Sequence, residues 1–260
     1  LRDGDAEKRL LQRVSLGLLL GSLTASLLLL GSYFYRTALE FEYVADYSAL
    51  ELPLRYKLAG VWAGRDGTLL IWCWAAALAL NWELWRGASG DAGGSSASKD
   101  ARRRGDAHQQ RVLVLFASGI LLALAAIQLA INPFTLSDPV PTAGRGLNPL
   151  LQSPWMTIHP PIVFTAYGFA IPVYAAGLAA LAVRGDAWLD VGRRWARWFW
   201  LLTASALTMG GYWAYTTLGW GGFWAWDPVE TSGLLPWLAA SLTGGISAAI
   251  LAAAAFRSAL

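Results

Sequence analysis

Cysteine, histidine and charge are all scarce in this sequence of 260 residues, which contains one cysteine, two histidines and 14% charged residues. A single cysteine, Cys73, excludes an internal disulfide framework and any paired-cysteine redox or zinc site. Soluble chains average roughly 25% charged residues, so the low charge and the 56% hydrophobic content argue against a water-soluble globule. The net charge of +3 is too small to indicate a nucleic-acid partner.

Long apolar runs are present instead. A helix needs about 20 apolar residues to cross a bilayer, and six runs approach that length. They lie at about 14–34, 68–86, 111–131, 161–183, 198–218 and 234–256. The sequence therefore predicts an all-α, polytopic integral membrane protein in which residues 1–260 form one membrane domain of about six transmembrane helices, in contact with membrane lipid.

Six spans place both termini on one side of the membrane, and the distribution of basic residues indicates which side. Segments 35–67, 132–160 and 219–233 hold only five of the twenty Lys and Arg residues, namely Arg36, Arg55, Lys57, Arg65 and Arg145. Because basic loops stay inside, we expect cytoplasmic termini in the plasma (inner) membrane. Residues 87–110 are small, polar and basic, which predicts a flexible cytoplasmic loop in which His108 has no role.

Tryptophan is concentrated on the outer side, where residues 212–237 hold five of the fifteen tryptophans. An interfacial belt of indoles is one interpretation. If residues 220–227 are helical, however, one face carries an aromatic row that ends in a carboxylate, formed by Trp220, Phe223, Trp224 and Asp227. Gly221 and Gly222 would let a ligand approach the backbone closely. This second interpretation predicts a platform for a flat, hydrophobic ligand.

The same stretch also contains a helix-start signal. Asp227 is suited to be an N-cap, Pro228 the first helical residue and Glu230 the partner in a capping box. Both roles can coexist, because a cap would fix where the platform ends and where the next span begins. We expect Glu230 to be a capping partner rather than an acid catalyst.

His159 is the only histidine on the predicted outer side, and it precedes Pro160 and Pro161. Proline disfavours helical geometry in the residue before it, so we expect the imidazole on an extended elbow at the membrane surface. A neutral imidazole there could ligate haem iron axially. The alternative is an ordinary hydrogen-bonded interfacial histidine.

Two outer arginines have similar alternatives. Arg65 precedes Asp66 in a turn, where the residues predict a local ion pair or a contact with a propionate or another carboxylate. Arg145 lies near the Asn148-Pro149 turn signal. The thioethers of the only two methionines, Met156 and Met209, are expected to pack rather than to bind metal.

The motifs as a set resemble a known family. WGGFWAWDPVE at 220–230 is similar to the tryptophan-rich WWD signature of haem-handling membrane proteins in cytochrome c maturation. VWAGRDGTLLIW around 61–72, NPF at 132–134 and GRGLNPLLQSPWMTIHPP at 144–161 complete the pattern. In this order they resemble the N-terminal half of the CcmF family, the membrane subunit of the bacterial cytochrome c haem lyase.

This resemblance implies a site for haem. His159 would be one of two external axial histidines and the metal ligand, and the outer platform would consist of Trp220, Gly221, Gly222, Phe223, Trp224, Trp226 and Asp227. The family presents haem so that its vinyl groups form thioethers with a Cys-x-x-Cys-His apocytochrome. Its partners are a haem chaperone and a subunit that delivers the apocytochrome. Binding and orientation, rather than acid–base groups, would be the protein's contribution as part of a haem lyase complex.

Departures from the family pattern leave alternatives open. The family's first span and C-terminal half are not matched, so a second membrane chain or that missing half would supply the other axial histidine. The family's b-haem histidine falls at Gly245, and Phe223 replaces a tryptophan. A non-catalytic scaffold half of a split haem lyase is therefore one competing function. A membrane transporter is the other, although ion-coupled transport usually needs ionisable residues near the midplane of the membrane.

Overall fold

The protein is described here by a computed structural model covering residues 2–86, 97–184, 186–219 and 221–242. These residues are almost entirely helical, and within them the only β-type pairing is a single antiparallel bridge between Phe41 and Leu136. An all-helical chain satisfies its backbone hydrogen bonds within each segment, as crossing a bilayer requires. The predicted all-α class is confirmed.

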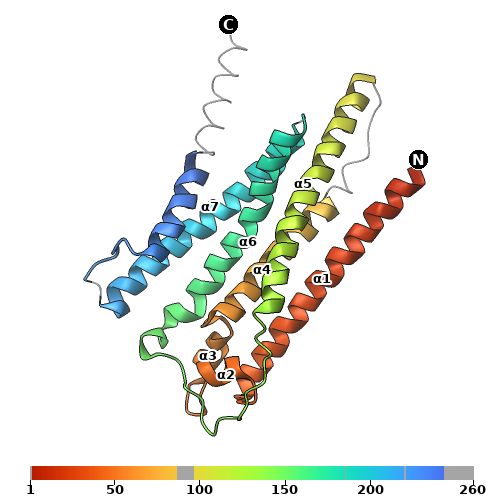
Figure 1. Ribbon diagram of the computed structural model, residues 1–260. Coiled ribbons are helices and arrows are strands. Elements are labelled where there is room, and N and C mark those ends of the chain that lie inside the picture. Colours follow the sequence, from red (N-terminus) through yellow and green to blue (C-terminus); the bar gives the residue numbers. More distant parts are fainter. Residues whose placement is uncertain (1, 87–96, 185, 220, 243–260) are drawn as a thin grey trace.

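Five long helices run beside one another (Figure 1), with short helices in the connections at one end. In chain order the elements are α1 (Arg2–Arg36), α2 (Glu42–Tyr47), α3 (Leu54–Ala59), η1 (Gly60–Trp62), α4 (Arg65–Arg86), α5 (Ala97–Ala130), η2 (Pro149–Leu151), α6 (Pro154–Ala182), α7 (Ala187–Trp213) and the π-helical η3 (Ala214–Leu218). Residues 228–242 are also helical.

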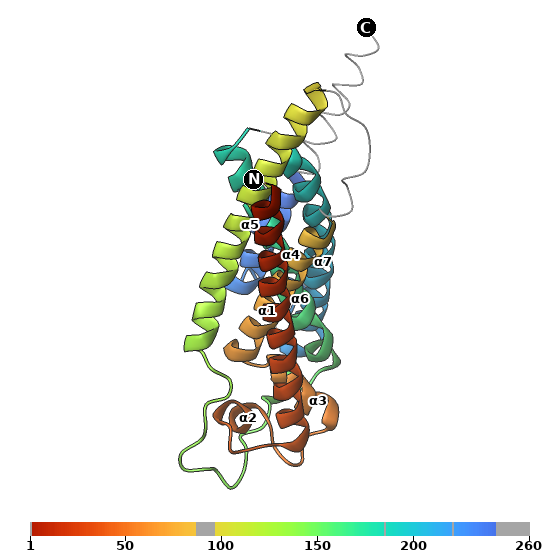
Figure 2. The ribbon, with the colours of Figure 1, turned by 90° about the vertical axis from the view of Figure 1, so that its right-hand side faces the viewer.

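The connecting segments gather at two opposite ends of the bundle. α2, α3 and the connection 131–153 lie together at one end, and the turned view in Figure 2 shows the same grouping. The start of α1 and the end of α4 lie at the other end. This arrangement matches the predicted alternation of inner and outer segments. The assignment of the first end to the outside remains a prediction from the basic residues.

Four of the helices in the described part are long and apolar enough to cross a membrane: Leu10–Arg36, Arg65–Arg86, Ala107–Ala130 and Pro154–Ala182. They correspond to the first four predicted spans. The fifth predicted span, 198–218, is helical within α7 and η3 but is not among these four. The sixth, 234–256, is helical to residue 242, and its remainder lies outside the described residues.

Two predicted loops are shorter than expected. α5 begins at Ala97, so the prediction of a loop is wrong for 97–110, while 87–96 is not described. This stretch is rich in Ala, Arg and Gln, which are strong helix formers, and the adjoining span extends into it at no nucleation cost. α7 likewise begins at Ala187, inside the expected inner loop 184–197.

α4 is the most buried of the four candidate spans and lies in the centre of the core. Its side chains Ala75 and Ala76 are fully buried, and a Cβ built on Gly168 of α6 would lie 2.5 Å from the Cβ of Ala75. Such small residues let two helix backbones approach closely, which is how membrane helices pack in the absence of a hydrophobic drive between them. α6 therefore lies directly against α4 at this level.

A buried polar contact joins α4 to α7 near the end of the bundle where α4 ends and α7 begins. The carboxylate of Glu83 pairs with the guanidinium of Arg194 and accepts a 2.7 Å hydrogen bond from Nε1 of Trp195. Glu83 is 4% exposed. A buried carboxylate needs such compensation because an unpaired charge is costly to desolvate. The contact fixes the start of α7 against α4.

Candidate functional site

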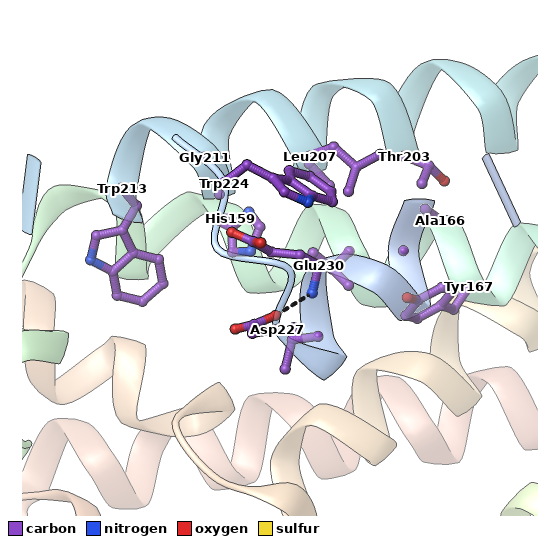
Figure 3. A pocket seen from close by; sticks show the side chains of 15 residues that line it. His159, Ala166, Tyr167, Thr203, Leu207, Gly211, Trp213, Trp224, Asp227 and Glu230 are labelled. Atoms are coloured by element: carbon purple, nitrogen blue, oxygen red, sulfur yellow. Dashed lines mark hydrogen bonds between the residues drawn. The ribbon is translucent and has the colours of Figure 1, made fainter. Parts of the chain in front are cut away.

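A cavity of about 350 Å³ lies between α6, α7 and the chain that follows η3 (Figure 3). Its volume is within the range of small-molecule sites. It is lined by His159, Val163, Ala166, Tyr167, Thr203, Ala206, Leu207, Gly210, Gly211, Trp213, Trp224, Asp227, Val229, Glu230 and Gly233. His159 and the Trp-rich segment, residues 221–227, are about 65 residues apart in sequence but line the same cavity.

His159 is helical, so the predicted extended elbow is wrong. α6 begins at Pro154 and continues through Pro160 and Pro161. The side chain of Ser153 caps its first turn by accepting a hydrogen bond from the amide of Trp155. Pro160 has no N–H for the carbonyl of Met156, and Nε1 of Trp62 donates to that carbonyl instead, at 2.7 Å. A partner from a distant segment therefore makes up for the bond that the proline removes.

The imidazole of His159 faces α7. Its ring lies 5.9 Å from the ring of Trp213, edge to face. Nδ1 is buried and has no hydrogen-bond partner. A buried imidazole nitrogen without a hydrogen-bond partner is a candidate metal ligand, because neutral imidazole binds metals through such a nitrogen.

The Trp-rich segment is not helical at 221–227, so the predicted aromatic helix face is wrong. Gly219 and Gly221 have φ angles of 70° and 75°, and Trp226 has a φ of 59°. This left-handed region ends a helix and suits glycine, so the chain turns away after η3. The pair Gly221-Gly222 therefore indicates a turn in the chain rather than a platform for a ligand.

The turn divides the predicted platform residues into two groups. Trp224 lines the cavity, with its ring 5.8 Å from the ring of Trp226. Trp226 is 73% exposed, and Phe223 is also exposed, where it stacks on Tyr215 at 4.5 Å. Gly221 and Gly222 do not line the cavity, and Trp220 lies outside the described residues. Trp224 and Asp227 are therefore the platform residues that line the cavity.

Asp227 and Glu230 form the predicted helix cap. Oδ1 of Asp227 accepts a 2.6 Å hydrogen bond from the amide of Glu230, which confirms the N-cap, and Pro228 is the first helical residue. Oε2 of Glu230 accepts from the amide of Ala225 at 2.9 Å, two residues before the usual capping-box position. This pair of bonds ties the Trp-rich segment to the helix that follows it.

Four buried polar atoms of cavity residues have no hydrogen-bond partner: His159 Nδ1, Trp213 Nε1, Trp224 Nε1 and Glu230 Oε1. In the view of Figure 3 the side chain of Glu230 extends toward His159. Buried polar groups are nearly always hydrogen-bonded in native proteins, so a cluster of exceptions at one cavity needs a physical explanation. A ligand with both apolar surface and polar or metal-bound atoms would satisfy them.

The predicted arginines do not line this cavity. Arg65 forms the expected local ion pair, with Nε 3.5 Å from Oδ1 of Asp66, and Arg145 pairs with Asp46 at 2.8 Å. Both arginine side chains are largely exposed, so these pairs contribute little to stability. The methionines do not line the cavity either, and Met156 packs in a small cluster with Trp213.

The sequence reasoning missed the wall residues on the two helices. Along α6 the lining residues follow His159 at helical spacing, at Val163, Ala166 and Tyr167. Along α7 the same spacing connects Thr203, Ala206, Leu207, Gly210 and Gly211. The signal that would have found them is a row of small and polar residues at i, i+3, i+4 and i+7 in two adjacent spans, read with His159 inside a helix.

Comparison with known proteins places these features in a family. The protein-family model described as Cytochrome C assembly protein matches residues 105–253 of this chain. Cytochrome c-type biogenesis protein CcmF of Haemophilus influenzae is 31% identical over 202 residues, which make up 76% of this chain and 29% of that protein. CcmF of Escherichia coli is 30% identical over 243 residues, 90% of this chain and 35% of that protein.

One further relative and a solved structure agree with this. Probable cytochrome c-type biogenesis protein NrfE of Escherichia coli is 34% identical over 76% of this chain and 34% of its own length. The solved structure of Cytochrome c Heme Lyase CcmF superposes with a TM-score of 0.67 and 24% identity, over 88% of this chain and 34% of that chain. The chain thus spans about a third of the length of these relatives, and the structural likeness supports the fold.

Proposed function

Because this chain belongs to the cytochrome c assembly protein family and is of the CcmF type, we propose that its cavity binds haem as a substrate, with His159 as an axial ligand. The observation that carries the proposal is the buried, unpartnered Nδ1 of His159 beside Trp224. Neutral imidazole is a common axial ligand of haem iron, and an indole presents a flat apolar face to a macrocycle.

The donor set fits haem better than it fits a free metal ion. No group of three or more His, Cys, Asp or Glu side chains in the described part of the chain could hold an ion. One imidazole can still bind an iron that a porphyrin already holds on four sides. The helix walls supply the apolar surface, through residues such as Val163, Ala166 and Leu207.

Each residue of the site has a proposed task. His159 holds the iron, Trp224 covers one face of the ring, and Asp227 keeps the Trp-rich segment in register with the helix that follows it. An apocytochrome would approach along an outer ledge formed by Gly221, Gly222, Phe223 and Trp226. Trp220, which belongs to the same motif, lies outside the described residues. Arg65 and Arg145 lie away from the cavity, where they can meet the carboxylates of a ligand or of a partner.

In this proposal the chain presents haem outside the membrane for covalent attachment to an apocytochrome c. Haem supplies the vinyl groups to which the two cysteine thiols add, and the protein holds the ring in place while they do so. The partners would be a haem chaperone, the apocytochrome with its delivery subunit, and a further membrane segment that carries the second axial histidine. The chain would cross the inner membrane with its termini in the cytoplasm.

Haem titration of the purified chain in detergent tests the proposal. His159→Ala should weaken binding by more than the about 10- to 100-fold typical of changes to outer-shell groups, and the Soret band of the complex should be lost. His108→Ala is the matched control because His108 is the only other histidine and is exposed on α5. Equal Soret bands in the wild-type chain and the His159→Ala variant would remove His159 as the ligand.

The spectrum provides a second criterion. α5 and α6 begin at opposite ends of the bundle (Figure 1), and His108 lies in the first half of α5 whereas His159 lies in the second turn of α6. They cannot ligate one iron within one molecule, so the haem complex should have a single-histidine spectrum.

In cells that make c-type cytochromes, His159→Ala in the full-length protein should abolish their maturation without lowering the protein level. Normal maturation would contradict the proposal.

A further inference from the structure

We propose that Gly210 and Gly211, adjacent residues of α7, are positioning residues that set the imidazole of His159 and the Trp-rich segment against the same cavity. This inference rests on the proposed function, since it explains how the two parts of the haem site are held together. Neither residue belongs to any motif singled out in the sequence. Their importance comes from what occupies the space that a side chain would fill.

The imidazole of His159 occupies the space beside Gly210. A Cβ built on Gly210 would lie 3.0 Å from Cε1 of the ring, 3.5 Å from Nε2 and 3.7 Å from Nδ1. The ring is also in edge-to-face contact with Trp213 one turn further along α7. It therefore has little freedom to move aside, and even a methyl group at position 210 would tilt or shift it.

The Trp-rich segment occupies the space beside Gly211. Here a Cβ would lie 2.8 Å from the carbonyl oxygen of Phe223. This neighbour is a backbone atom, so it cannot rotate away as the end of a flexible side chain can. The segment is held on its other side by the bond from the amide of Ala225 to Glu230. A side chain at 211 would therefore displace the backbone next to Trp224.

The two contacts act through one stretch of backbone. Adjacent Cα atoms are about 3.8 Å apart, and adjacent residues of a helix point about 100° apart around its axis. One glycine thus faces the imidazole while the next faces the Trp-rich segment. The separation between the axial ligand and the indole platform is set by a single peptide unit of α7, which is a more rigid spacer than a loop.

Gly177 provides a matched control. It lies inside α6, and a Cβ built on it would meet nothing within 4 Å. Alanine is a better helix former than glycine at both positions. Helix propensity alone therefore predicts that Gly177→Ala and Gly210→Ala have the same mildly stabilising effect. A difference between the two variants reports the contact with His159.

The first measurement needs no haem. The chain has only two histidines, so a sample labelled with ¹⁵N-histidine gives ring signals from His108 and His159 alone. Gly210→Ala should shift the His159 ring signals and leave those of His108 in place, whereas Gly177→Ala should shift neither. Unchanged His159 signals in Gly210→Ala would overturn the role of Gly210, whatever the outcome for haem.

The second measurement is haem titration of the same variants. Gly210→Ala and Gly211→Ala should each weaken haem binding about 10- to 100-fold, as changes behind a metal ligand do, while Gly177→Ala binds as the wild type does. If the wild type shows no His159-dependent haem band, the proposed function fails. If that band is present and both glycine variants bind normally, the positioning role fails and the proposed function survives.

A double variant covers the case in which Gly210→Ala does not fold. Replacing the ring by a methyl group in His159→Ala/Gly210→Ala vacates the space that the new side chain needs. Folded yield in detergent should then return to that of His159→Ala alone. A double variant that remains unfolded would show that Gly210 serves the helix rather than the histidine, and would overturn the inference.

Discussion

The indole Nε1 of Trp62 donates a 2.7 Å hydrogen bond to the carbonyl of Met156, the acceptor that Pro160 leaves without an amide inside α6. The two residues are 94 positions apart in sequence. The bond supports the helical turn that carries His159, so the conformation of the candidate ligand depends on a residue of the short helix η1.

Trp62→Phe should therefore weaken the start of α6. The variant keeps an aromatic ring but leaves the Met156 carbonyl without a partner, at a cost of about 1–3 kcal/mol in the free energy of unfolding. Chemical unfolding in detergent, followed by helical circular dichroism, measures this. Trp82→Phe is the control because Trp82 is 55% exposed. Equal stability of the two variants would show that the bond contributes nothing.

Tyr43 should be a second point of stability at the same end of the bundle. Its buried hydroxyl accepts hydrogen bonds from the amides of Gly64 and Gly67, at 3.0 and 3.3 Å, and lies 3.2 Å from the carbonyl of Val61. Tyr43→Phe leaves these groups unpaired and should cost about 1–3 kcal/mol in the free energy of unfolding. Tyr35→Phe, at an exposed position, should cost nothing.

Tyr43 also predicts a pH dependence. Burial raises the pKa of its phenol above the ordinary value, so the folded protein keeps a proton that the unfolded chain releases. Stability is then unaffected below a pH of about 10, the pKa of free tyrosine, and declines as the pH rises above it. A smaller decline in Tyr43→Phe than in the wild type would identify this group, and an identical decline would exclude it.

The cap of the helix at 228–242 can be tested with two substitutions. Asp227→Ala removes the acceptor for the amide of Glu230 and should cost about 0.5–2 kcal/mol in the free energy of unfolding. Asp227→Asn keeps an acceptor and should retain most of that stability. If Asn destabilises as much as Ala, the carboxylate charge at this position matters more than the hydrogen bond.

The ion pair between α4 and α7 gives a fifth prediction. Glu83→Ala leaves the guanidinium of Arg194 without its partner and removes the acceptor for the indole of Trp195. Breaking a buried pair in this way costs about 3 kcal/mol or more in the free energy of unfolding. Glu51→Ala, at an exposed position, is the control. A melting temperature in Glu83→Ala equal to that of the control would contradict a stabilising role.

Much of the fold could be predicted because it depends on local patterns. Apolar run length predicted the first four spans, and three closely spaced residues, Asp227, Pro228 and Glu230, predicted the helix start and its cap. The conformation at His159 could not be predicted, because it depends on Trp62, which no local rule connects to Pro160. The path of 221–227 was missed for a related reason, since the periodic spacing of its aromatic residues outweighed its two glycines in the interpretation.

The close approach of Gly168 to Ala75 has a consequence for how the cavity can open. Because the backbone of α6 lies directly against α4, α6 cannot move closer to α4. The cavity wall that bears His159 is therefore held in place. The opposite wall, at 221–227, is attached chiefly by two hydrogen bonds and a stacked pair of exposed rings. A ligand larger than the cavity would therefore displace 221–227 more readily than it would displace the wall formed by α6.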